Sequence, residues 1–292
     1  MTLLAYQVFD AVIREQSFLK AAESLNITPS AVSHTISSME KELGFPLFVR
    51  SKQGVHLTGY GESLRPYING VLQSEESLRT AIDQMNGLER GTVKIGTFNS
   101  ICTTMVPGLI KSFRELHPFI EIEVFQGTYD DVRRWIKNGT VDLGFLSISS
   151  AEGLPITPLF KDRLVSVMPK GTDIGEKNYI HMEELRGRGF VSQSESTDAD
   201  IQNLLKKYGV EVQAQCHVVD DQSTIAMVEA GLGVCIMPSL LMSTMRSDVD
   251  IYPIEPAEYR VIGICTKNEQ TISPAVKSMR EHILTTMQEK LL

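Results

Sequence analysis

The stretch Thr28–Gly44, TPSAVSHTISSMEKELG, defines one helix in unusual detail. Thr28 is a favoured N-cap residue, Pro29 suits the first helical position, and Gly44 suits the position just after the helix. The apolar residues recur at spacings of four, three and four, as on one face of an α-helix: Val32, Ile36, Met39 and Leu43. The sequence therefore predicts a short helix that buries this stripe.

The opposite face of the same helix is polar but carries little charge. It consists of Ser30, Ser33, His34, Ser37 and Lys41. A helix that only faces water typically carries more Glu–Lys pairs. Small hydroxyls and an imidazole are side chains that contact phosphates or base edges. The pattern favours a surface that binds a ligand, while a small helical domain without a ligand remains the alternative.

The flanking residues place this helix in a larger motif. Residues 3–16 predict a first helix, and Ser17 can cap a second one over residues 18–26. A helix, a short turn and a second helix with a polar outer face form a helix-turn-helix candidate. Beyond it, Arg50 to Leu57 predict a small hairpin, or wing, with Gln53-Gly54 as its turn.

Charge limits how such a domain would bind nucleic acid. The net charge is −8 for the whole chain of 292 residues. The first ninety residues hold eight Lys/Arg and ten Asp/Glu. Attraction to phosphate must therefore come from a local patch, such as the basic residues of the wing.

A long helix is predicted from about residue 60 to residue 85. Its apolar residues follow a heptad seam interrupted at Glu75: Leu64, Ile68, Val71, Leu78, Ile82 and Met85. Such a seam predicts a helical partner, and so a homodimer. The alternative is one amphipathic helix that packs on its own domain. Asn86-Gly87 and Arg90-Gly91 mark a break, so we expect domains at 1–59, 60–90 and 91–292.

From Gly91 onward, strand and helix patterns alternate, which predicts a mainly parallel sheet and two α/β lobes. In such folds ligands bind beyond the carboxyl ends of the strands. Here those ends are rich in hydroxyl and amide side chains, and helix N-termini favour anions. We therefore expect a small anionic or polar ligand, although the same residue types are also ordinary N-caps.

The run from Ala21 to Leu64, AAESLNITPSAVSHTISSMEKELGFPLFVRSKQGVHLTGYGESL, resembles LysR-type transcriptional regulators. The resemblance implies an N-terminal all-α winged helix-turn-helix domain with a long dimerising linker helix. It also implies a C-terminal α/β effector-binding domain with two subdomains of the periplasmic-binding-protein kind. Subdomain I would take residues 91–161 and 268–292, and subdomain II residues 162–267. Strands near Arg163–Val167 and Gly263–Thr266 would cross between the two subdomains.

The resemblance also implies partners and site residues. The partners are double-stranded promoter DNA, a small-molecule effector, RNA polymerase, and further copies of the chain in a homodimer or homotetramer. The implied DNA-binding residues are Thr28, Ser30, Ser33, His34, Ser37, Lys41, Arg50, Lys52 and Thr58. The implied effector-binding residues are Asn99, Ser100, Ile101, Thr128, Ser147, Ser194, Ser196 and Asp220. His34 departs from many members, which have arginine there, and this weakens contact with guanine.

Other classes of protein are less well supported. The sequence lacks a membrane-length apolar run and a secretory leader, so we expect no membrane partner and a cytoplasmic location. It also lacks Walker A, GxSxG and HExxH motifs, so we expect no catalytic site. Its four cysteines lack metal-site spacing, and no metal or cofactor beyond the effector is expected. A solute-binding or enzymatic α/β module with a purely structural helical N-terminus remains the alternative.

Two further points concern the effector domain. A peroxide-sensing branch of the family uses a cysteine pair in the second subdomain, but residues 162–215 contain no cysteine. We therefore do not expect that mechanism.

Several arginines could each bind a carboxylate or face water, and the sequence does not choose among them: Arg133, Arg134, Arg163, Arg186 and Arg188.

Overall fold

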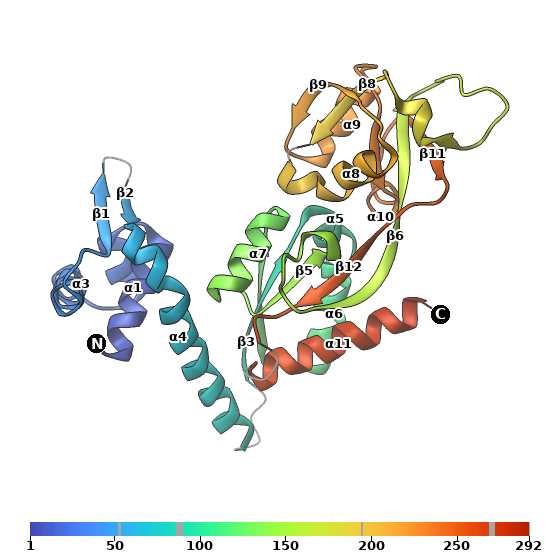
Figure 1. The fold of residues 1–292 in the computed structure, drawn as a ribbon. Helices are drawn as coiled ribbons and strands as arrows, with labels where there is room; N and C mark the ends of the chain where they lie inside the picture. Colours follow the sequence, from blue (N-terminus) through green and yellow to red (C-terminus); the bar gives the residue numbers. More distant parts are fainter. Residues whose placement is uncertain (52–53, 86–89, 194, 269–271, 292) are drawn as a thin grey trace. The chain divides into compact units, whose positions relative to one another are not determined.

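The computed structural model describes residues 1–51, 54–85, 90–193, 195–268 and 272–291. The chain separates into two compact units, with the division near residue 88. The first unit holds the helix-turn-helix, and the second holds the α/β lobes (Figure 1).

The N-terminal unit has the predicted order of elements. They are α1 (Leu3–Glu15), α2 (Phe18–Ser24), α3 (Pro29–Leu43), β1 (Phe48–Ser51), β2 (Gly54–Leu57) and α4 (Gly59–Met85). Ser17 and Thr28 cap α2 and α3 through their side-chain oxygens, as predicted. Gly44 adopts the left-handed conformation, with φ of 81°, which ends α3. Helix α2 ends at Ser24, two residues earlier than predicted.

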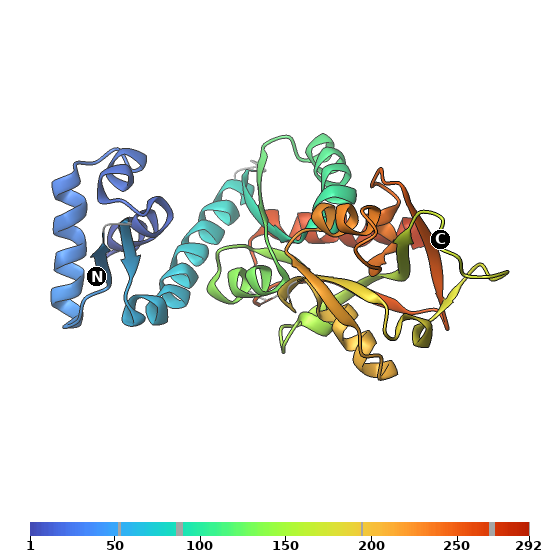
Figure 2. The same ribbon diagram turned by 90° about the horizontal axis from the view of Figure 1, so that it is seen from above.

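Helices α1, α2 and α3 surround one apolar core. Val8 and Phe9 of α1 pack with Val32 of α3, and all three are fully buried. Ala21 and Ala22 of α2 are also buried, because small side chains let the helices cross closely. In both views α3 lies on the outside of this unit (Figures 1 and 2).

The wing is fixed to the end of α3. The Oε1 atom of Glu40 accepts hydrogen bonds from the backbone N–H groups of Leu47, at 2.7 Å, and Phe48, at 3.2 Å. The Phe48 ring lies 5.3 Å from that of Phe9. The hairpin begins at Phe48, earlier than the predicted Arg50, and its expected turn includes residues 52 and 53, which lie outside the described residues.

The first α/β lobe contains three parallel strands, as predicted. These are β3 (Gly91–Thr97), β4 (Ile120–Gln126) and β5 (Leu143–Ser147). The lobe also contains α5 (Asn99–Thr104), α6 (Val106–Leu116), α7 (Tyr129–Asn138), the short helix η1 (Ile148–Ser150) and α11 (Pro274–Leu291). Strand β12 (Tyr259–Cys265) joins β5 in the antiparallel sense, so the sheet is mixed. Helix α11 packs against α6 and β3 (Figure 2).

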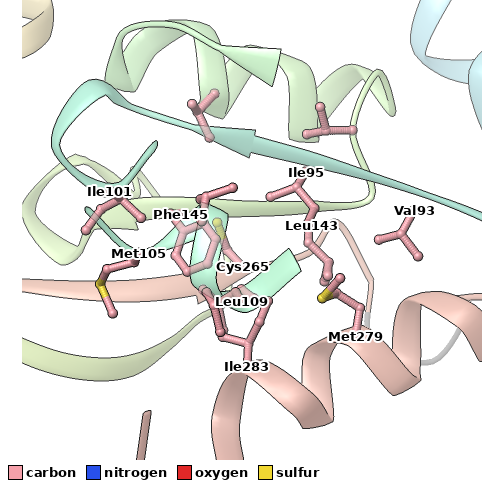
Figure 3. Packing of buried hydrophobic residues seen from close by; sticks show 14 of the residues in the cluster. Val93, Ile95, Ile101, Met105, Leu109, Leu143, Phe145, Cys265, Met279 and Ile283 are labelled. Atoms are coloured by element: carbon pink, nitrogen blue, oxygen red, sulfur yellow. The ribbon is translucent and has the colours of Figure 1, made fainter. Parts of the chain in front are cut away.

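Apolar side chains from strands and helices fill the core of this lobe (Figure 3). Ile95, Leu143 and Phe145 from the sheet lie against Met279 and Ile283 of α11. Cys265 lies in the same core and donates its thiol to the carbonyl oxygen of Gly144 at 3.3 Å. Burial raises the pKa of Cys265 to about 12, so this thiol stays protonated and has a structural role.

The second lobe is built on the end of a long strand. Its elements are β6 (Ile156–Pro169), β7 (Ile180–His181), η2 (Met182–Leu185), β8 (Gly189–Gln193), α8 (Glu195–Tyr208), β9 (Gln213–Val218), α9 (Asp221–Glu229), β10 (Cys235–Pro238), α10 (Ser239–Met242) and β11 (Val249–Glu255). The sequence prediction missed α5, α10, β7 and β11. The first three are too short for a periodic pattern, and Pro253 makes the sequence of β11 an unfavourable strand candidate, although the strand continues through it.

Strand β6 connects the two lobes (Figure 1). Its first half, up to Arg163, pairs with β12, and its second half, from Leu164, pairs with β10 and β11. The predicted crossing near Arg163 is therefore confirmed. The crossing predicted at Gly263–Thr266 is wrong, because Gly263 to Cys265 pair with β5 and the start of β6. We propose that subdomain II ends before Tyr259 and not at residue 267.

Candidate DNA-binding surface and effector cavity

The outward face of α3 presents most of the predicted polar row. Ser30, His34, Ser37 and Lys41 are exposed, and Ser33 is half-buried. The Thr28 hydroxyl accepts the N–H of Ala31 at 3.2 Å and lies 3.0 Å from the Ser30 hydroxyl. Thr28 therefore fixes the start of the helix, and the rest of the row faces outward.

The wing residues are placed less completely. Arg50 lies in β1 and its side chain is outside the description, as is all of Lys52. Thr58 has a structural task, because its hydroxyl donates to the carbonyl oxygen of Pro46 at 2.7 Å and accepts the N–H of Gly61 at 3.1 Å. These bonds join the wing to the start of α4 and occupy the group that was predicted to contact DNA.

A cavity of about 470 Å³ lies between the two α/β lobes. The strand ends and helix starts of both lobes line it, as the fold class predicts. Four of the predicted effector residues are in its wall: Asn99, Ser100, Thr128 and Asp220. Ile101 is instead fully buried in the first core. Ser194 lies outside the described residues, and the side chain of Ser196 is likewise outside the description.

Ser147 is buried behind the cavity wall and does not line it. Its hydroxyl donates to Oδ1 of Asp200 at 2.7 Å, and the Ser149 hydroxyl donates to the same atom at 2.5 Å. The Tyr129 hydroxyl donates to Oδ2 of Asp200 at 3.1 Å. Asp200 itself lines the cavity. Ser147 therefore holds a cavity carboxylate in place.

Arg260 is the residue of the cavity that sequence reasoning missed. Only 6% of it is exposed. Its Nε and Nη2 atoms donate to Oδ2 of Asp162 at 2.9 and 2.7 Å. Nη2 also donates to the Ser100 hydroxyl at 2.8 Å, and Nη1 donates to the Tyr129 hydroxyl at 3.2 Å. An arginine within the apolar strand YRVIGIC was a visible clue, because such positions rarely hold a charge without a partner.

Asp162 extends this network into the second lobe. Its Oδ1 atom accepts the N–H of Leu240, at 3.0 Å, at the start of α10. The Asp162–Arg260 pair therefore links α5 and α7 of the first lobe to α10 of the second. Burial raises the pKa of Tyr129, which keeps its phenol protonated as a donor to Asp200.

A direct hydrogen bond also joins the two walls of the cavity, and two further bonds orient its partners. Nδ2 of Asn99, in the first lobe, donates to Oδ2 of Asp221, in the second lobe, at 2.6 Å. Nε2 of Gln193 donates to the other carboxylate oxygen of Asp221 at 2.7 Å. Nε2 of Gln126 donates to Oδ1 of Asn99 at 3.0 Å. The two walls are therefore in contact in this structure.

The lowered pKa of Asp220 predicts that acid destabilises the start of α9. The backbone N–H of Ser223 and its hydroxyl hold the pKa of Asp220 below its ordinary value of 3.8. A lowered folded pKa means that this cap stabilises the fold above pH 3.8 and that its contribution disappears as the pH falls further. In thermal unfolding between pH 2.5 and 6, Asp220→Asn should lower the Tm at pH 6 and converge with the wild type near pH 2.5. A constant difference across this range would contradict the prediction.

Two family models match the chain. Residues 3–62 match the bacterial regulatory helix-turn-helix protein, lysR family, and residues 86–288 match the LysR substrate binding domain. The chain belongs to the LysR family. This LysR-type transcriptional regulator therefore combines a DNA-binding helix-turn-helix domain with an effector-binding domain.

Relatives and solved structures agree with this family over nearly the whole chain. The uncharacterized HTH-type transcriptional regulator YvbU of Bacillus subtilis is 28% identical over 95% of this chain and 96% of its own. A full-length OxyR variant from Pseudomonas aeruginosa has a TM-score of 0.77 at 22% identity, covering 97% of this chain and 98% of its own. Full-length CbnR complexed with its target DNA has a TM-score of 0.67 at 19% identity, covering 98% and 100%.

Two kinds of feature are absent from the residues that the structure describes. No helix among them is both long and apolar enough to cross a membrane. The same residues include no group of three or more His, Cys, Asp or Glu side chains that could hold a metal ion.

Proposed function

We propose that this regulator binds promoter DNA through the outward face of α3, with the wing beside it on the phosphate backbone. The observation that supports this role is the exposed row of Ser30, His34, Ser37 and Lys41 on a helix whose other face is buried. The target-bound CbnR structure shares this fold. The regulator acts by binding rather than by catalysis, and it works in the cytoplasm.

The effector would bind in the cavity between the two α/β lobes. Ser100 and Thr128 line it from the first lobe, and Asp220 and Asp221 line it from the second. A ligand that contacts both walls favours one arrangement of the lobes over others through its different affinities for them. That bias would reach the DNA-binding domains and alter promoter bending or contact with RNA polymerase.

Helix α4 supplies the surface for a second copy of the chain. Tyr67, Leu78 and Ile82 are 74%, 61% and 48% exposed, although all three are large and apolar. Leu78 and Ile82 belong to the predicted heptad seam, whereas its earlier members Leu64 and Ile68 pack in the core of their own domain. The exposed apolar part of α4 favours burial against a partner helix. We propose a homodimer through α4, with a homotetramer formed by two such dimers.

Leu78→Glu should convert the dimer into a monomer. The change removes an apolar contact worth roughly 1.5–3 kcal/mol from each copy and places a charge in the interface. The dimer Kd should therefore rise roughly 100-fold or more. Light scattering after size exclusion measures this, with Glu76→Gln on the same helix as the control. An unchanged dimer would place the interface elsewhere.

A gel shift tests the proposed function as a whole. The full-length protein is titrated onto the DNA upstream of its own gene and onto a scrambled duplex of equal length and composition. We expect binding to the upstream DNA at least tenfold tighter than to the scrambled duplex. Equal affinity for both would count against promoter recognition and would favour the α/β module as the functional part.

A further inference from the structure

We propose that the effector of this regulator carries a positively charged nitrogen, an ammonium or a guanidinium group, that Asp221 binds. The inference rests on the proposed function, since it assumes that the cavity between the lobes is the effector site. The strand ends and helix starts predicted an anionic or polar ligand, and this proposal excludes the anionic choice.

The charge of the cavity wall is the first observation. Its described lining residues include one cationic side chain, Arg260, and four carboxylates: Asp131, Asp200, Asp220 and Asp221. An anion entering this cavity would meet an excess of like charge.

Arg260, the cationic residue among the described wall residues, already forms hydrogen bonds within the protein. Arg260 donates twice to Asp162, once to Ser100 and once to Tyr129. These bonds use four of the five guanidinium N–H groups. Bidentate recognition of a ligand carboxylate needs two free parallel donors, so Arg260 cannot offer it without breaking the network.

Three helix starts beside the cavity, those of α7, α9 and α10, are occupied by carboxylates of the chain itself, although helix starts otherwise attract anions. Asp220 accepts the N–H of Ser223 at 2.8 Å at the start of α9. Asp131 accepts the N–H of Thr128 at 3.0 Å at the start of α7 and pairs with Arg134. Asp162 accepts the N–H of Leu240 at 3.0 Å at the start of α10. The partial positive charge of these helix ends, which would attract an anionic ligand, is therefore already neutralised by carboxylates of the protein.

We assign the ligand to Asp221, because it bonds across the cavity, whereas Asp200 is held by three hydroxyls and Asp220 caps a helix. Among the described residues, the two oxygens of Asp221 accept hydrogen bonds from the side-chain amides of Asn99 and Gln193. Among the residues that the structure describes, no lysine or arginine forms an ion pair with it. A ligand cation would supply that missing partner through charge-assisted hydrogen bonds. Because Asp221 also bonds across the cavity, the same contact would bias the lobes.

Calorimetric titration of the full-length protein tests the sign of the ligand charge. The cationic probes are agmatine and putrescine, and the anionic probes are glutarate and shikimate. We expect at least one cation to bind, with a Kd that rises as salt is increased from 25 to 300 mM, and neither anion to bind. Binding of an anion, or of no cation, would overturn the proposal.

A pair of variants then tests the residue. Asp221→Asn should weaken the affinity for the cation roughly 10- to 100-fold, the range of one charge-assisted hydrogen bond. Asp248→Asn should leave this affinity unchanged, because Asp248 is an exposed carboxylate of the same lobe outside the cavity wall. Circular dichroism confirms that each variant is folded. Equal cation affinity in Asp221→Asn and wild type would overturn the assignment. The gel shift on the same preparation reports separately whether promoter binding itself fails.

Discussion

Arg260→Ala should lower the free energy of unfolding of the effector-binding domain by about 3–5 kcal/mol. The guanidinium and the Asp162 carboxylate are both almost fully buried, with 5% and 2% of their side chains exposed. Removing the arginine leaves a buried carboxylate without its cation, and it leaves the Ser100 and Tyr129 hydroxyls without their donor. Urea denaturation followed by circular dichroism measures the loss.

The size of this effect depends on the unpaired charge and can be separated from lost packing. Asp162→Leu combined with Arg260→Met should recover part of the loss, because apolar residues of similar volume can replace a buried ion pair. Recovery should be incomplete, since Asp162 also accepts the N–H of Leu240. Arg114→Ala, at an exposed position of α6, should change the free energy of unfolding by less than about 0.5 kcal/mol. If Arg260→Ala lowered the free energy of unfolding by as little as Arg114→Ala, the hydrogen-bond network around Arg260 would be unimportant for stability.

Ser33→Ala/His34→Ala should weaken specific binding to promoter DNA by roughly 10- to 100-fold and leave binding to scrambled DNA nearly unchanged. A contact with a base edge contributes about 1–3 kcal/mol of discrimination, and these two side chains lie on the outward face of α3. Neither forms part of the apolar core of the domain, so the variant should stay folded. Competition gel shifts at fixed salt measure both affinities.

The matched control is Ser63→Ala, which removes an exposed hydroxyl from α4, outside the predicted recognition surface. It should bind promoter DNA as the wild type does. If the double variant kept full specificity, sequence readout would have to lie in the wing or in the shape of the DNA. An equal loss on both duplexes would instead indicate that α3 contacts only the phosphate backbone.

Local chemistry explains why the helix-turn-helix could be predicted so closely. Helix α3 runs from Pro29 to Leu43, as its N-cap threonine and terminal glycine predicted. Capping groups lie within four residues of the backbone groups that they satisfy, and the apolar stripe repeats every turn. Thr58 shows the limit of such reasoning, because its partner Pro46 lies across the wing and no local pattern distinguishes a structural hydroxyl from a DNA-binding one.

The sequence by itself determined the bounds of α3 and the order of the longer elements, since each depends on neighbours along the chain, and the resemblance to the family supplied four residues of the cavity wall. Only the tertiary structure decided the chemistry of the cavity. Arg260 meets Ser100, Tyr129 and Asp162 across 98 to 160 residues of sequence, and Asp221 meets Asn99 across 122. Such distances in sequence leave no periodic pattern. The charge that a ligand experiences therefore follows from which side chains the fold brings together and which of them it pairs.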